Sequence, residues 1–199
     1  MVNTAVLVSG GGTNLQALLD AQAAGSLPHV QIKLVVASNP NAYALQRAAA
    51  AGVETAVCSA RDYDTPAARD EALCRLLQNH GIDLVVLAGY LSMIGPKVLA
   101  AYPDKIVNIH PSLIPSFCGA GYYGLRVHEA ALAKGVKITG ATVHLVNENY
   151  DEGRILAQKA VAVQDGDTPE TLQRRVMEQA EWIILPQAVE ALAQQLEQT

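Results

Sequence analysis

Short apolar runs alternate with longer amphipathic stretches along the first half of the chain. The apolar runs are typical of strands buried on both faces, and they cover Ala5–Ser9, Ile32–Ser38, Glu54–Ser59, Leu84–Tyr90 and Ile106–His110. The stretches between them have helical spacing and are rich in Ala, Leu, Gln and Arg: Asn14–Ala24, Ala42–Ala51 and Pro66–His80. This alternation predicts an α/β fold with right-handed crossovers and a mainly parallel central sheet flanked by helices.

The pattern changes in the second half of the chain. Thr139–Asn147 and Ile155–Val163 are strand-like runs joined by a polar loop, which predicts a late antiparallel strand pair. The stretch from Thr168 to about Gln198 is helical in spacing, and Pro186 within it is expected to end or kink the helix. Neither a repeat nor a linker interrupts the sequence, so we expect one continuous domain.

Composition narrows the class of protein. The chain has 199 residues, of which half are hydrophobic and 17% are charged, as expected for a globular domain. Fourteen basic against nineteen acidic residues give a net charge of −5 with no basic stripe, which argues against a nucleic-acid partner. No apolar run approaches the roughly 20 residues that span a bilayer, and the N-terminus has the pattern of a strand rather than a signal peptide. We therefore expect a cytoplasmic protein without a membrane partner.

A glycine-rich segment, Ser9–Asn14, follows the first strand and precedes the first helix. Its three glycines allow a ligand to approach the backbone, and the helix N-terminus offers unpaired N–H groups, which together suit a phosphate. The segment is not a dinucleotide fingerprint, because Leu15 stands where that pattern needs its third glycine. A tight turn without a ligand is the alternative interpretation.

A second candidate lies at the end of the fifth strand. Asn108 and His110 are two residues apart, so their side chains point the same way, and an amide beside an imidazole suits oxyanion stabilisation with proton transfer. A buried histidine bonded to the backbone is the alternative. Asp151 is an ordinary turn residue unless its loop folds over His110, where its carboxylate would raise the pKa of the imidazole. The other histidines are interpreted as structural or surface residues: His29, His80, His128 and His144.

Two further chemistries are disfavoured by the residues. Cys118 lies near the His110 segment but has no neighbouring base in the sequence, so an activated thiol is the weaker hypothesis. The three cysteines are widely spaced and no pair of histidines has metal-ligand spacing, so we expect no metal.

Taken together, these segments resemble the folate-dependent formyltransferase family, and within it the glycinamide ribonucleotide formyltransferases. The resemblance covers essentially the whole chain and is carried by Val6–Gln16, Leu87–Tyr90, Asn108–Leu113, Thr142–His144 and Asp151. It implies a Rossmann-like formyltransferase fold and transfer of a formyl group from 10-formyltetrahydrofolate to the amine of glycinamide ribonucleotide, a step of purine biosynthesis. It also implies a single domain over 1–199, with a ribonucleotide-phosphate half to about residue 103 and a catalytic, folate-cleft half from about residue 104.

The resemblance also implies roles for individual residues. Asn108, His110 and Asp151 match the catalytic trio, with His110 held protonated by Asp151. Gly12, Thr13 and Asn14 match the ribonucleotide phosphate loop, and Glu181 matches a contact to the ribose or glycinamide. The folate cleft is matched by Leu91, Ser92, Met93, Ile94, Asn108, Asn147, Glu148, Asn149, Tyr150 and Asp151. Both substrates are small molecules, and monomer and homodimer stay open.

Two departures from the family pattern concern the folate glutamate tail and one loop. Relatives often have arginine in the segment aligned with Ser92 and near Thr65–Pro66, whereas this chain has none there, which leaves Arg61 or Arg69 as possible substitutes. The segment Ser116–Arg126 is longer than in many members.

The related methionyl-tRNA formyltransferases and formyltetrahydrofolate deformylases carry appended domains, so the length of 199 residues argues against both. The deformylase, which shares the trio, and a non-catalytic nucleotide-binding module are the alternatives.

Overall fold

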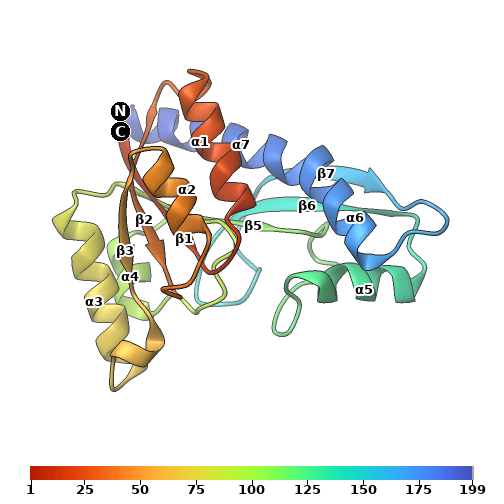
Figure 1. Cartoon of the computed structure of the whole chain (residues 1–199), viewed down its shortest axis with the longest axis horizontal. Helices are drawn as coiled ribbons and strands as arrows, with labels where there is room; N and C mark the ends of the chain where they lie inside the picture. The colour runs from red at the N-terminus through yellow and green to blue at the C-terminus, as the bar shows by residue number, and fades with distance from the viewer. Residues whose placement is uncertain (199) are drawn as a thin grey trace.

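In a computed structural model that describes residues 1–198, a single seven-stranded sheet runs through the chain (Figure 1). Thr199, the last residue of the predicted domain, lies outside the described residues. The strand order is β3-β2-β1-β4-β5-β6-β7; the first five strands are parallel, and β6 is antiparallel to both β5 and β7. The strands are β1 Val2–Val8, β2 Val30–Ala37, β3 Glu54–Val57, β4 Leu84–Leu87, β5 Ile106–His110, β6 Ile138–Leu145 and β7 Ile155–Ala162.

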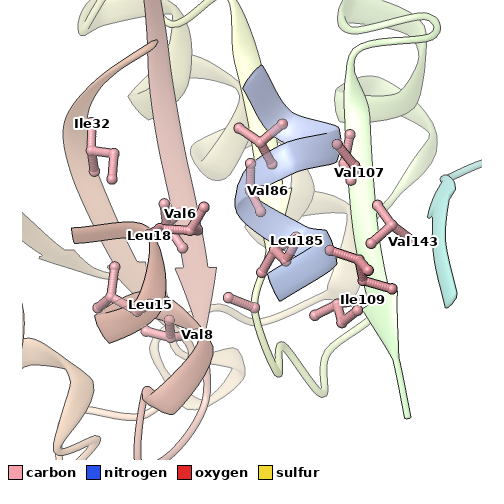
Figure 2. Packing of buried hydrophobic residues seen from close by; sticks show 14 of the residues in the cluster. Val6, Val8, Leu15, Leu18, Ile32, Val86, Val107, Ile109, Val143 and Leu185 are labelled. Carbon is pink, nitrogen blue, oxygen red and sulfur yellow. The ribbon is translucent and has the colours of Figure 1, made fainter. Parts of the chain in front are cut away.

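Helices cover both faces of this sheet (Figure 1). They are α1 Thr13–Ala23, α2 Ala44–Ala50, α3 Pro66–Asn79, α4 Pro96–Ala101, α5 Leu125–Lys134, α6 Pro169–Val176 and α7 Trp182–Glu197, with a 3₁₀ turn at Ala60–Asp62 and a π turn at Met177–Glu181. Side chains alternate along β1, so Val6 and Val8 pack with α1 and α7 on one face, as Figure 2 shows, while Ala5 and Leu7 pack with α3 and α4 on the other. The predicted mainly parallel α/β sheet with a late antiparallel pair is confirmed.

Pro186 does not end the last helix, as the sequence predicted it could. It lies inside α7, and the irregular turn is the π turn that precedes α7. A proline removes the N–H that would bond to the carbonyl four residues earlier. Here that carbonyl belongs to Trp182, the first residue of α7, so the hydrogen bond is lost where the pairing already changes from π to α. Among residues 1–198, no helix is both long and apolar enough to cross a membrane.

The chain reversal after β6 brings distant residues to the site. β6 ends beside the start of β5, where Leu145 pairs with Val107, yet the loop 146–154 folds back and carries Asp151 to the other end of β5, next to His110. The carboxyl ends of β1, β4 and β5 meet at the same edge of the sheet, where open α/β sheets place their ligands.

Candidate active site

A cavity of about 590 Å³ opens at the carboxyl ends of β1, β4 and β5. This volume is within the range of small-molecule sites. All the site residues predicted from the sequence line it, from the phosphate loop (Gly12, Thr13, Asn14), the π turn (Glu181), the loop after β4 (Leu91, Ser92, Met93, Ile94), β5 (Asn108, His110) and the loop after β6 (Asn147, Glu148, Asn149, Tyr150, Asp151).

The His110 ring is anchored at one nitrogen and exposes the other to the site. Its Nε2 lies 2.8 Å from the Phe117 carbonyl oxygen, an acceptor only, so Nε2 carries a proton and donates. Its Nδ1 lies 3.7 Å from Asp151 Oδ2, beyond hydrogen-bond distance. Nδ1 is therefore the ring atom available for a reacting group.

Burial has the largest effect on the pKa of His110. The ring is almost fully buried, and burial lowers its pKa below the ordinary value, although the Phe117 carbonyl and the Asp151 carboxylate act in the opposite direction. The neighbouring His144 lowers it further. This direction is opposite to the expected one, in which Asp151 raises the pKa of His110, because desolvation outweighs the attraction of a carboxylate that makes no direct hydrogen bond.

Asp151 connects two loops while staying ionised. Its Oδ2 accepts a 2.8 Å hydrogen bond from the Gly119 N–H, and its Oδ1 lies 3.5 Å from His144 Nε2. Burial alone would raise the pKa of this carboxyl, but the hydrogen bonds from His144 and Gly119 and the nearby His110 together lower it. The loop that carries Asp151 thus lies next to His110, which is the condition under which the sequence gives Asp151 a place in the site.

His144 lines the cavity, whereas the sequence pattern indicates a structural or surface residue. It stands opposite Asn108 in the antiparallel register of β5 and β6, and its Nε2 lies 3.1 Å from Asn108 Nδ2. Its Nδ1 donates to the Leu145 carbonyl oxygen at 2.8 Å, and its Nε2 faces both the Asn108 amide and the Asp151 carboxylate. His144 thereby fixes the orientation of the Asn108 amide. Strand register is long-range information, which is why residue spacing did not reveal this pair.

The predicted phosphate loop contacts the π turn in the cavity lining. Asn14 Nδ2 donates a 2.6 Å hydrogen bond to Glu181 Oε2, and Thr13 Oγ1 lies 3.7 Å from Met177 Sδ. Burial raises the pKa of Glu181 to about 7, against the opposing effect of the Asn14 hydrogen bond. Gly12 has a φ of 73°, and a Cβ at this position would lie 2.6 Å from the Ala44 Cβ, so only glycine fits.

His128, on α5, is buried and lines the cavity, whereas the sequence indicates only a structural or surface residue. Neither of its ring nitrogens has a hydrogen-bond partner within the described residues. Burial lowers its pKa to about 4, and His110 contributes in the same direction. The imidazole is therefore neutral at physiological pH.

The predicted folate cleft has an apolar rim and no basic side chain. Leu91 and Met93 keep 66% and 51% of their surface exposed, and no lysine or arginine of residues 1–198 lines the cavity. Arg69 does not fit the role of a substitute for the missing arginines. It is buried and donates to the Tyr90 hydroxyl, the Met93 carbonyl and the Cys58 carbonyl, so its guanidinium supports the loop from inside. Arg61 lies exposed on the 3₁₀ turn.

Cys118 lacks the environment of an activated thiol. Burial raises the pKa of its thiol, and the carboxylates of Asp151 and Glu152 raise it further. A raised pKa keeps the thiol protonated, which argues against Cys118 as a nucleophile, in agreement with the sequence. Within residues 1–198, no group of three or more His, Cys, Asp or Glu side chains is arranged to hold a metal ion.

Comparison with known proteins identifies the family. The family model described as "Formyl transferase" matches residues 2–189. A phosphoribosylglycinamide formyltransferase of Haemophilus influenzae is 39% identical, over 94% of this chain and 84% of that protein. The crystal structure of glycinamide ribonucleotide transformylase 1 from Symbiobacterium toebii matches with a TM-score of 0.92 and 42% identity, over 98% of this chain and 89% of that one. The corresponding structure from Geobacillus kaustophilus gives a TM-score of 0.90 and 40% identity, over 97% and 99%.

Some relatives are much longer than this chain. It spans 59% of the chloroplastic phosphoribosylglycinamide formyltransferase of Arabidopsis thaliana, at 40% identity over 87% of this chain. It spans 18% of the trifunctional purine biosynthetic protein adenosine-3 of Gallus gallus. The match to the family model and to relatives of similar length covers both the cavity loops and the sheet that carries them. The chain belongs to the formyl transferase family.

Proposed function

We propose that this chain transfers the formyl group of 10-formyltetrahydrofolate to the amine of glycinamide ribonucleotide. The observation that carries the proposal is the convergence of a phosphate-type glycine loop and the Asn108–His110–Asp151 group on one cavity. The names of relatives that share the fold support formyl transfer to the same ribonucleotide. The cytoplasm is the proposed location, although two plant relatives are named as chloroplastic.

The two substrates occupy different parts of the cavity in this proposal. The ribonucleotide phosphate lies against the N–H groups of the glycine loop, while Glu181 and Asn14 face its ribose or glycinamide part. The folate ring lies between the apolar Leu91–Ile94 loop and the Asn147–Asp151 loop, which line the cavity together. The first half of the chain, to about residue 103, supplies the phosphate loop, and the remainder supplies the catalytic group; Glu181 of the second half also reaches the ribonucleotide side.

Chemistry begins when the amine attacks the formyl carbon and the formyl oxygen becomes negative. The Asn108 amide, oriented by His144, offers its N–H to that oxygen. A single donor of this kind contributes roughly 3–4 kcal/mol to lowering the barrier. Burial keeps His110 neutral at the start, so its Nδ1 can take the proton that the attacking nitrogen loses.

The resulting imidazolium lies between the oxyanion and the Asp151 carboxylate, both of which stabilise it. The C–N10 bond then breaks, and the proton moves from Nδ1 to N10, which leaves tetrahydrofolate and the formylated amine. His110 therefore begins and ends the cycle neutral, and Asp151 stays ionised throughout.

The proposal is tested by mixing the chain with both substrates and measuring tetrahydrofolate and formylated ribonucleotide. Equal amounts of the two products are expected. His110→Gln keeps a side-chain N–H for the Phe117 carbonyl but has no titratable nitrogen, so kcat is expected to fall at least roughly a hundredfold. Wild-type melting behaviour of this variant would separate lost chemistry from lost folding.

Other outcomes point to the alternatives. Formate without formylated product would identify a deformylase. Ribonucleotide binding without turnover would identify a binding module, and an active His110→Gln variant would overturn the mechanism.

A further inference from the structure

We propose that Arg47 is a positioning residue that turns the glycine loop toward the ribonucleotide phosphate. Arg47 belongs to α2 and does not line the cavity, so it acts from behind the loop. The inference rests on the proposed function, because it concerns how the phosphate of that substrate is held.

Two carbonyl groups of the loop accept hydrogen bonds from α2. Arg47 Nε donates a 2.8 Å hydrogen bond to the Gly11 carbonyl oxygen, and the Ala44 N–H donates a 3.1 Å hydrogen bond to the Gly10 carbonyl oxygen. Both carbonyls therefore point toward α2. In a trans peptide the C=O and the following N–H point in opposite directions. The N–H groups of Gly11 and Gly12 consequently point away from α2.

The other side of the loop faces open space. Gly10 and Gly11 line the cavity, and a Cβ added to either would have nothing within 4 Å. Within the described residues, the N–H groups of Gly11 and Gly12 donate no hydrogen bond to protein. Two successive N–H groups thus face open space at the start of α1, where the helix dipole also favours an anion.

The negative charge of the phosphate has to be balanced by the site. A phosphate dianion is to be bound in a cavity that no lysine or arginine of residues 1–198 lines, so backbone N–H groups carry the interaction. A cationic donor on the Gly11 carbonyl polarises the Gly11–Gly12 peptide and makes the Gly12 N–H a better donor. Arg47 therefore supplies positive charge to the phosphate through one peptide unit, without direct contact.

The guanidinium itself is fixed from two more directions. Its NH1 donates to Gln16 Oε1 at 3.0 Å, and its Cζ lies 5.0 Å from the centre of the Tyr43 ring. Gln16 is on α1, so Arg47 links α2 to the helix that follows the loop. The planar guanidinium donates both hydrogen bonds at once from different nitrogens. The ammonium group of lysine cannot reproduce this geometry.

The test compares Arg47→Met, which removes both hydrogen bonds, with Arg47→Lys and the wild type. Arg75→Met is the matched control, because Arg75 lies exposed on α3 and pairs with Glu71 outside the site. For Arg47→Met we expect the KM for glycinamide ribonucleotide to rise roughly tenfold or more, as for loss of a charged hydrogen bond. The KM for 10-formyltetrahydrofolate and kcat should change less than about twofold, and Arg47→Lys should recover part of the loss.

A binding measurement separates this inference from the proposed function. Ribose 5-phosphate and ribose are titrated calorimetrically into each variant, which requires no catalysis. Weaker binding of ribose 5-phosphate by Arg47→Met, with unchanged binding of ribose, supports the inference even if the wild type lacks formyl transfer. Unchanged ribose 5-phosphate binding overturns it. Equal losses for both substrates with a lower melting temperature also overturn it, since they would show a structural role only.

Discussion

Asn14 Nδ2 donates a 2.6 Å hydrogen bond to Glu181 Oε2, which joins the first turn of α1 to a π turn 167 residues later in the chain. The carboxyl is buried, and among residues 1–198 it forms no ion pair. An ionised carboxylate without a cation is costly in such a place, and this cost explains why the pKa of Glu181 rises to about 7. Because the buried Glu181 carboxyl has no cationic partner, it is expected to accept hydrogen bonds from a bound ligand.

Glu181→Gln is expected to stabilise the fold at alkaline pH. The native state binds the Glu181 proton more tightly than the unfolded state, so wild-type stability from this group is complete below pH 4.5 and is lost as the pH rises through 7. The uncharged glutamine removes that loss, which amounts to about 3 kcal/mol above pH 7. Urea unfolding of both proteins at pH 5 and pH 8 measures the difference.

The matched control is Glu178→Gln, in the same π turn but solvent-exposed and paired with Arg174. It should leave stability almost unchanged at both pH values. A gain for Glu181→Gln that is the same at pH 5 and pH 8 would contradict the buried-carboxylate explanation. The KM for the ribonucleotide should increase in Glu181→Gln.

His128→Leu is expected to flatten the acid side of the stability profile. The pKa of His128 is lowered to about 4 from the ordinary 6.5, so the unfolded state binds the proton more tightly. Wild-type stability therefore falls between pH 6.5 and pH 4, by about 3 kcal/mol from this residue. Leucine does not titrate, and unfolding free energies measured at intervals over this range should show the smaller slope.

His80→Gln serves as the comparison for His128→Leu. The pKa of His80 is raised by the Leu76 carbonyl and Glu54, so this residue contributes stability at low pH that is lost as the pH rises. Its replacement should leave the slope between pH 6.5 and pH 4 almost unchanged, because the contribution of His80 changes only above the ordinary pKa of histidine. Parallel profiles for wild type and His128→Leu would show that the buried imidazole is not responsible.

Local sequence information was sufficient for the strands and for the first three helices, as well as for two of the three site segments. A strand, three glycines and a helix start are adjacent in sequence, so the loop at Gly10–Gly12 follows from short-range pattern alone. Asn108 and His110 also follow from the two-residue period of a strand. These predictions succeeded because each depends on neighbours in the chain.

The properties that sequence did not yield depend on tertiary contacts. His144 reaches Asn108 only through the register of β6 on β5, and Asp151 reaches Gly119 only through a loop that folds back. The lowered pKa of His110 does not follow from the sequence, because a nearby carboxylate can be anticipated, whereas the degree of burial cannot. Arg69 was equally ambiguous, because sequence does not tell a surface guanidinium from one bonded inside the protein.

Asp151→Asn is expected to move the acid limb of the pH–rate profile to lower pH. The Asp151 carboxylate raises the pKa of His110, although burial has the larger, opposite effect, so its neutralisation lets that pKa fall further. Neutral His110 then persists to lower pH in the free enzyme. At the same time kcat should drop, because the imidazolium formed during the reaction loses its counter-charge. Profiles of kcat/KM from pH 5 to pH 9 measure both effects, and a limb that moves to higher pH would contradict the assignment.

Ser92→Arg is expected to strengthen binding of a folate that carries several glutamates. The wild-type cavity has no lysine or arginine lining within residues 1–198, and the rim beside Ser92 is formed by the exposed Leu91 and Met93, so tail carboxylates meet no cation there. An exposed ion pair contributes up to about 1 kcal/mol, which corresponds to a KM reduced by up to roughly fivefold at low salt. The reduction should disappear at high salt, because exposed charges are screened. Ser92→Gln, which adds length without charge, should leave the KM unchanged. A wild-type KM that already rises steeply with salt would instead show that a cation outside the lining, such as Arg61, holds the tail.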